Sequence, residues 1–165
     1  MRVGIALGSN LGDRMAHLRA AVAAIREFAE APVLVSRVYE TEPVDCPPGA
    51  PSFLNAAIEI GYSGDLFALL ERLQAIERKH GRLEIRERNS PRTADLDILY
   101  GDDLTIDTAA LKVPHPRLST RAFVLLPLND IIPDRKLPGA VKTIREELLK
   151  LETRGCKLTQ YYIDQ

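Results

Sequence analysis

The stretch that decides the fold is residues 89–103, NSPRTADLDILYGDD. Its central part, residues 94–100, predicts a buried strand, yet Asp95 and Asp97 lie two positions apart within it. Side chains two apart on a strand project from the same face, and like charges on one face repel each other. We therefore expect a cation between the two carboxylates, and a polar site on that face of the sheet.

The elements on either side of this strand predict the fold class. Alternating apolar residues predict further strands near residues 2–7, 33–39 and 53–60. Helical spacing predicts one helix over about 14–28, capped by Asp13, and another from Ser63 or Asp65 to His80. The order β-α-β-β-α-β is typical of an α+β, ferredoxin-like sheet with both helices packed on one face. C-terminal additions follow: a short turn and strand near 101–106, helices near 122–126 and 141–151, and a β-prone tail.

Length and composition indicate one ordinary globular domain over residues 1–165, with 45% apolar and 27% charged residues. The formal net charge of -1 argues against nucleic acid or a membrane surface as a partner. The sequence shows neither a signal peptide nor an apolar run of about 18 residues, so we expect a cytoplasmic protein, acting as a monomer. In that compartment Cys46 and Cys156 are expected to be free thiols.

The alternation of side chains divides the predicted sheet into two faces. The residues expected to point at the helices are bulky: Val3, Ile5, Leu7, Leu54, Ala56, Ile58, Leu96, Ile98 and Tyr100. The other face collects small, polar and aromatic residues: Gly4, Ala6, Gly8, Phe53, Asn55, Asp95 and Asp97. Such a face suits a polar ligand better than a core, and the proline-rich segment at residues 40–52 is a candidate binding loop beside it.

Asp95 and Asp97 are candidate metal ligands. Mg²⁺ takes one or two carboxylates together with waters and substrate phosphates. Two exposed aspartates at a strand edge are the alternative, although Asp is depleted in strands. Arginines gather nearby and could bind phosphate oxygens, or could form surface ion pairs with Glu84 and Glu87. They are Arg82, Arg86, Arg88 and Arg92, followed later by Arg117 and Arg121.

Other polar and aromatic residues have two readings each. His115 could donate to a phosphate or satisfy a buried carbonyl group. The amide of Asn55 could recognise a heterocycle, because it both donates and accepts hydrogen bonds. Phe53 and Phe123 could stack on a ring, or could be ordinary core residues.

Five segments, taken together, resemble a known family. GSNLGDR (8–14), YETEP (39–43), FLNAA (53–57), PRTADLDIL (91–99) and VPHPRLSTRAFVLLPL (113–128) closely resemble the 6-hydroxymethyl-7,8-dihydropterin pyrophosphokinases of folate biosynthesis. The likeness runs in order from about residue 2 to residue 133. It implies a ferredoxin-like α+β fold and an enzyme that transfers pyrophosphate from ATP to the pterin hydroxymethyl group, releasing AMP.

The resemblance also implies roles for individual residues. Asp95 and Asp97 would hold two Mg²⁺ ions, and Arg82 and Arg92 would be catalytic arginines. The ATP site would comprise Gln74, Glu77, Arg88, Ile98, His115 and Arg121. The pterin pocket would comprise Thr41, Pro43, Val44, Phe53, Asn55 and Phe123. Many members carry Trp-Gly where this chain has Asn89 and Ser90.

Two other classes of protein remain as alternatives. A non-catalytic ferredoxin-like module that senses a nucleotide would bind ATP without forming AMP. A two-metal nuclease would also use paired aspartates and arginines, but it would need a broader basic surface than a net charge of -1 supplies.

Overall fold

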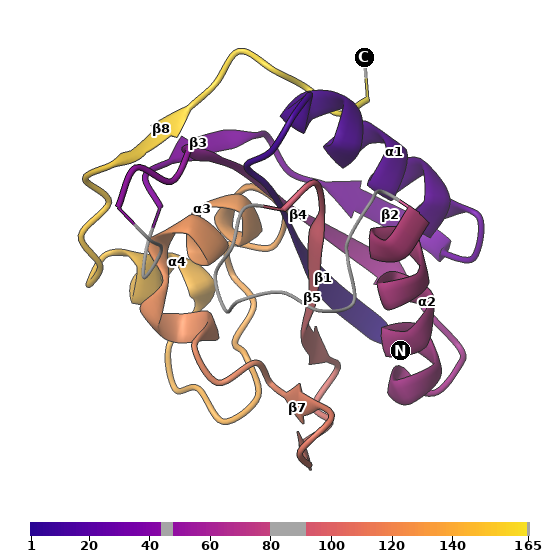
Figure 1. Cartoon of the computed structure of the whole chain (residues 1–165). Coiled ribbons are helices and arrows are strands. Elements are labelled where there is room, and N and C mark those ends of the chain that lie inside the picture. Colours follow the sequence, from indigo (N-terminus) through magenta and orange to yellow (C-terminus); the bar gives the residue numbers. More distant parts are fainter. Residues whose placement is uncertain (44–47, 80–91, 165) are drawn as a thin grey trace.

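The computed structural model describes residues 1–43, 48–79 and 92–164 (Figure 1). Its central elements are β1 (Arg2–Ser9), α1 (Arg14–Arg26), β2 (Glu30–Val35), β3 (Tyr39–Thr41), β4 (Phe53–Gly61), α2 (Leu66–Lys79) and β5 (Asp95–Gly101). After them come β6 (Ile106–Asp107), β7 (Lys112–Val113), a 3₁₀ turn (Leu118–Thr120), α3 (Ala122–Ile131), α4 (Ile144–Leu148) and β8 (Cys156–Leu158). None of the helices in these residues is long and apolar enough to cross a bilayer.

The main sheet has the strand order β5-β1-β4-β3-β8, with β2 also paired to β4. Its pairings are antiparallel. This confirms the predicted mixture of helices with an antiparallel sheet. The chain runs from β1 through α1 to β2, β3 and β4, and α2 then lies between β4 and β5 in the sequence. The strand with the two aspartates, β5, pairs with β1.

The predicted strand at residues 33–39 is wrong as a single element, because it is divided into β2 and β3. Ser36 lies at the break, where its backbone N–H donates to the Ala57 carbonyl (2.9 Å) and its Oγ accepts from the Ala57 N–H (2.8 Å). The side chain of Ser36 thus replaces a backbone group of the ladder. The turn and strand predicted around 101–106 correspond to a turn at Asp102 and Asp103 followed by β6, which begins at Ile106 and pairs with β7 in a separate small sheet.

A first hydrophobic core lies between the sheet and α1 and α2, as predicted. Asp13 caps α1 by accepting a hydrogen bond from the Ala16 N–H (3.0 Å). The inward residues of this helix are Leu18, Ala21, Val22 and Ile25, and those of α2 include Leu66, Leu69, Leu73 and Ile76. They pack against the bulky residues of β1, β4 and β5, among them Val3, Ile5, Leu7, Ile58, Leu96 and Ile98.

A second core covers part of the opposite face of the sheet. There α3 and α4 pack on the other side from α1 and α2 (Figure 1). Its buried residues are Ala57, Leu99, Tyr100, Leu118, Val124, Leu125, Leu128, Leu137 and Ile144. The prediction that helices pack on one face therefore holds for α1 and α2 alone, and only the uncovered part of the second face can hold a ligand.

The orientation predicted for Tyr100 is wrong. In the pairing of β1 with β5, Gly4 lies opposite Tyr100 and Ile5 opposite Ile98, so Leu99 is an extra residue. This bulge reverses the alternation and turns Tyr100 into the second core, where it is fully buried. A Cβ atom on Gly4 would lie 2.2 Å from the Tyr100 ring, so only glycine fits opposite it.

Candidate functional site

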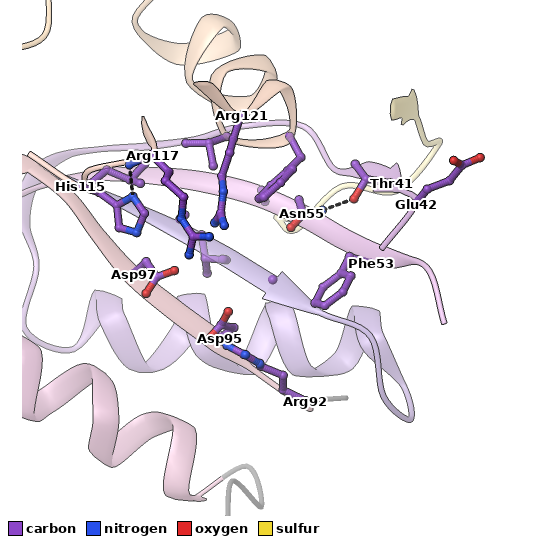
Figure 2. A pocket seen from close by; sticks show the side chains of 17 residues that line it. Thr41, Glu42, Phe53, Asn55, Arg92, Asp95, Asp97, His115, Arg117 and Arg121 are labelled. Atoms are coloured by element: carbon purple, nitrogen blue, oxygen red, sulfur yellow. Dashed lines mark hydrogen bonds and ion pairs between the residues drawn. The ribbon is translucent and has the colours of Figure 1, made fainter. Parts of the chain in front are cut away.

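A pocket of about 300 Å³ opens on the second face of the sheet, beside α3 (Figure 2). It brings together most of the predicted site residues that the structure describes. They are Thr41, Phe53, Asn55, Arg92, Asp95, Asp97, His115, Arg121 and Phe123. Its other lining residues include Gly8, Glu42, Leu99 and Arg117.

The two aspartates project from the same face of β5, as predicted. Asp95 lies opposite Gly8 on β1 and Asp97 opposite Ala6, and both side chains extend into the pocket (Figure 2). Gly8 keeps the floor open, because a Cβ atom there would lie 3.3 Å from Asn55 Oδ1. Within the described residues there is no cluster of three or more His, Cys, Asp or Glu side chains that could hold a metal ion. Two carboxylates are enough to hold a Mg²⁺ ion, because Mg²⁺ commonly takes its other ligands from water and substrate phosphates.

Arg92 is held against the aspartates just before β5 begins. Its Nη1 donates to Asp95 Oδ1 over 2.6 Å. Burial alone would lower the pKa of Arg92, but the carboxylates of Asp95, Asp97 and Glu77 outweigh burial and raise it. The guanidinium therefore stays charged at the edge of the pocket.

His115 enters the pocket as a neutral hydrogen-bond donor. Its backbone N–H donates to the Leu99 carbonyl (2.8 Å), and its Nδ1 accepts from the Arg117 N–H (3.2 Å). Burial lowers the pKa of His115, and the charges of Arg121 and Arg117 lower it further. With Nδ1 acting as an acceptor, the ring hydrogen lies on Nε2. The ring of His115 lines the pocket, and the carbonyl group of Leu99 is satisfied by the backbone N–H of His115. Donation by the ring to a phosphate stays a prediction.

The other end of the pocket combines an amide with aromatic rings. The Nδ2 of Asn55 donates to Thr41 Oγ1 over 2.6 Å, and both side chains are buried. Phe53 lies beside them on β4 (Figure 2). Phe123, at the start of α3, packs under the Arg121 guanidinium, 5.2 Å from the ring centroid. This end can recognise a flat ring that carries hydrogen-bonding groups.

The remaining predicted residues do not line this pocket, or lie outside the described part of the chain. Ile98 is 4% exposed and belongs to the first core, on the helix side of β5. Glu77 is buried on α2 and accepts from the Leu96 N–H (2.8 Å), whereas Gln74 is exposed on the same helix. Pro43 is partly buried next to Thr41. Arg82, Arg88 and Val44, together with Cys46, are not described.

Arg117 and Glu42 line the pocket as well, although the family resemblance assigned neither of them to a binding site. Arg117 lies two residues after His115 in the VPHPR segment and was expected to bind phosphate or to form a surface ion pair; the structure places it at the pocket. Glu42 directly follows β3 and lies within the YETEP segment, which was therefore the signal available for it. Paired carboxylates beside arginines and an imidazole, on an antiparallel sheet, form an arrangement that can bind phosphate groups.

Comparisons with known proteins agree with this class of site. Residues 4–133 match the family model for 7,8-dihydro-6-hydroxymethylpterin-pyrophosphokinase. A 2-amino-4-hydroxy-6-hydroxymethyldihydropteridine pyrophosphokinase of Bacillus subtilis is 51% identical over 128 residues, which are 77% of this chain and 75% of the relative. The protein with the same name in Pseudomonas aeruginosa is 42% identical over 139 residues, or 83% of this chain and 84% of the relative. The chain belongs to the 7,8-dihydro-6-hydroxymethylpterin-pyrophosphokinase family.

The fold is also found among solved structures. The crystal structure of wild-type Plasmodium falciparum HPPK-DHPS with pteroate superposes with a TM-score of 0.72 at 16% sequence identity. The match covers 90% of this chain and 44% of the Plasmodium chain, so the present chain spans less than half of that protein. At this level of identity the likeness concerns the fold alone.

Proposed function

We propose that the protein transfers pyrophosphate from ATP to the hydroxymethyl group of 6-hydroxymethyl-7,8-dihydropterin, in folate biosynthesis. The products are AMP and the pterin diphosphate. The observation that carries the proposal is one pocket, in a chain of this family, with Asp95 and Asp97 at one end and Asn55 at the other. These two ends suit a triphosphate and a heterocycle respectively.

The phosphate end of the pocket supplies positive charge and hydrogen-bond donors that can orient the phosphate groups. The guanidinium groups of Arg92, Arg121 and Arg117 and the Nε2–H of His115 can donate to phosphate oxygens. Asp95 and Asp97 would hold two Mg²⁺ ions, which when bound would offset negative charge on the phosphates. Arg82, a second proposed catalytic arginine, and Arg88 complete the proposed set, and Gln74, Glu77 and Ile98 are proposed to border the nucleotide.

The pterin end selects the acceptor. The amide of Asn55 is fixed by Thr41, so its oxygen can accept a hydrogen bond from the ring in one defined direction. Phe53 and Phe123 provide rings on which a flat heterocycle can stack. Pro43 and Val44 are proposed to complete this subsite.

The chemistry then rests on positioning and charge compensation. The pterin hydroxyl oxygen forms a bond to the β-phosphorus of ATP, the bond from that phosphorus to the α,β-bridging oxygen breaks, and the hydroxyl proton is lost to solvent. Arg92, fixed against Asp95, faces the phosphate oxygens on which charge develops. Burial and the charges of Arg121 and Arg117 lower the pKa of His115, which favours a neutral ring that donates a hydrogen bond without adding repulsion between cations.

We propose, more broadly, a single domain over residues 1–165 in the ferredoxin-like class. The strand order β5-β1-β4-β3, with α1 and α2 on one face, supports that class. The protein is further proposed to be a cytoplasmic monomer that binds small molecules, and the net charge of -1 supports small molecules over nucleic acid or membranes as partners.

The test is a direct assay of the purified protein with ATP, Mg²⁺ and 6-hydroxymethyl-7,8-dihydropterin. We expect AMP and pterin diphosphate in equal amounts, and neither product when the pterin is replaced by one that carries a methyl group in place of the hydroxymethyl. ATP binding without AMP formation would favour the nucleotide sensor. Cleavage of DNA or RNA without pterin would favour the nuclease.

A further inference from the structure

The turn after β1 contacts both chain segments that border the pocket. Asn10, which is 2% exposed, forms a reciprocal pair of hydrogen bonds with Arg92. The Asn10 N–H donates to the Arg92 carbonyl over 3.0 Å, and the Arg92 N–H donates to Asn10 Oδ1 over 2.7 Å. The Nδ2 of Asn10 also donates to the Pro51 carbonyl over 3.4 Å, just before β4 begins.

These contacts fix the backbone from which the Arg92 side chain extends. Arg92 lies three residues before Asp95, outside the ladder of β5, so strand pairing does not hold it. Asn10 is itself well placed, because it directly follows Ser9, which pairs with Leu54 in the sheet. The hydrogen bonds therefore hold the Arg92 backbone in a fixed position relative to β1. From that position Arg92 Nη1 donates to Asp95 Oδ1 (Figure 2).

We propose that Asn10 is a positioning residue that aims the Arg92 guanidinium at the phosphate end of the pocket. The proposal rests on the transfer reaction proposed above and on a role for Arg92 in it. Asn10 does not itself line the pocket, so it acts through Arg92 rather than on a substrate. Its side chain matters because its oxygen accepts from Arg92 while its NH₂ group donates toward Pro51.

The experiment combines three replacements with a double-variant cycle. Asn10→Ala removes both side-chain links, whereas Asn10→Asp keeps an acceptor for the Arg92 N–H and loses the donor to Pro51. Asn129→Ala is the matched control, since it replaces the same type of side chain at a position on α3 that does not line the pocket. Each change is also made in an Arg92→Ala background, and turnover is measured with enzyme in excess so that slow variants remain above background.

We expect Asn10→Ala to lower kcat roughly 10- to 100-fold, because small misplacements of a catalytic group have effects of this size. The KM values for ATP and pterin should change less than about threefold, since no lining residue is altered. Asn10→Asp should keep kcat closer to the unmodified protein, and Asn129→Ala should match it. In the Arg92→Ala background, Asn10→Ala should cause no further loss.

Other results would overturn the role of Asn10. They are an unchanged kcat in Asn10→Ala, an equal loss in Asn10→Asp, no effect of Arg92→Ala, or losses that multiply in the double variant. If Asn10→Ala cannot be purified folded, Asn10→Ser takes its place with the same expectations, because a serine hydroxyl is too short to reach the Arg92 amide. If the unmodified protein forms no pterin-dependent AMP, the proposed function is overturned together with the role of Asn10. If it forms AMP and only the variants depart from these expectations, the role of Asn10 alone is overturned.

Discussion

Asp95 and Asp97 lie two residues apart but have different surroundings. Asp95 is partly buried and paired with Arg92, whereas Asp97 is exposed at the pocket. Replacing Asp95 would disturb both the proposed metal site and the placement of Arg92. Replacing Asp97 tests the metal site while leaving the pair between Arg92 and Asp95 in place.

We predict that Asp97→Ala lowers turnover at least about 100-fold, because the remaining carboxylate holds Mg²⁺ too weakly. Its free energy of unfolding should change by less than about 0.5 kcal/mol, as is usual for an exposed residue. AMP formation across a Mg²⁺ series and urea denaturation measure the two effects. Asp107→Ala, at an exposed aspartate of β6, is the matched control. Near-normal turnover of Asp97→Ala with an unchanged Mg²⁺ dependence would refute the metal assignment.

At the scale of elements, α3 is fixed to β3 by a cluster around Asp130. The Tyr39 hydroxyl donates to the Asp130 carboxylate at 3.0 Å, and Arg37 Nη2 donates to its Oδ1 at 2.5 Å. Burial raises the pKa of Tyr39 to about 12, and the hydrogen bond to Asp130 acts in the same direction. The cluster lies near the end of α3, opposite the end that brings Arg121 and Phe123 to the pocket, and so sets the orientation of the helix.

This cluster predicts a loss of stability in alkali. The folded-state pKa of Tyr39 exceeds the unfolded value of about 10, so its contribution is complete below pH 10 and is lost as the pH rises toward 12. The loss amounts to at most about 3 kcal/mol. Urea denaturation at pH 9 to 12 should therefore show a steeper decline for the unmodified protein than for Tyr39→Phe. Tyr161→Phe, at an exposed tyrosine, should decline like the unmodified protein; equal slopes in all three would contradict the assignment.

Across the whole molecule, local sequence patterns predicted the elements that carry the site. They did not predict the features that depend on contacts between residues far apart in the sequence. Period-two alternation placed Asn55, Asp95 and Asp97 on one face, because each strand is regular at those positions. The bulge at Leu99 depends on a glycine, Gly4, that is far away in sequence, so alternation alone gave Tyr100 the wrong face. The second core was missed for a similar reason, since α4 is only five residues long and gains its place from packing.

The segment after residue 133 lies beyond the family match and contributes Leu137 and Ile144 to the second core. It also contributes Arg135 to a buried charge network on β4. Glu59 on β4, whose side chain is 4% exposed, accepts from Arg135 Nη1 (2.5 Å), Arg2 Nε (3.0 Å) and the Tyr100 hydroxyl (2.5 Å). The Arg135 guanidinium also lies 4.8 Å from the centroid of the Tyr100 ring. One arginine of the C-terminal segment thus contacts the strand bulge and the central strand β4 together.

We predict that Arg135→Ala lowers the free energy of unfolding by about 2 to 4 kcal/mol, because removing one partner of a buried ion pair leaves the other poorly compensated. Arg154→Ala, at an exposed ion pair, should change it by less than about 0.5 kcal/mol. Arg135→Met separates charge from packing, since methionine can still cover the Tyr100 ring but offers no donor to Glu59. If the charge network is the cause, urea denaturation will show Arg135→Met to be destabilised nearly as much as Arg135→Ala. Stability close to that of the unmodified protein in Arg135→Met would show instead that Arg135 acts by packing on Tyr100.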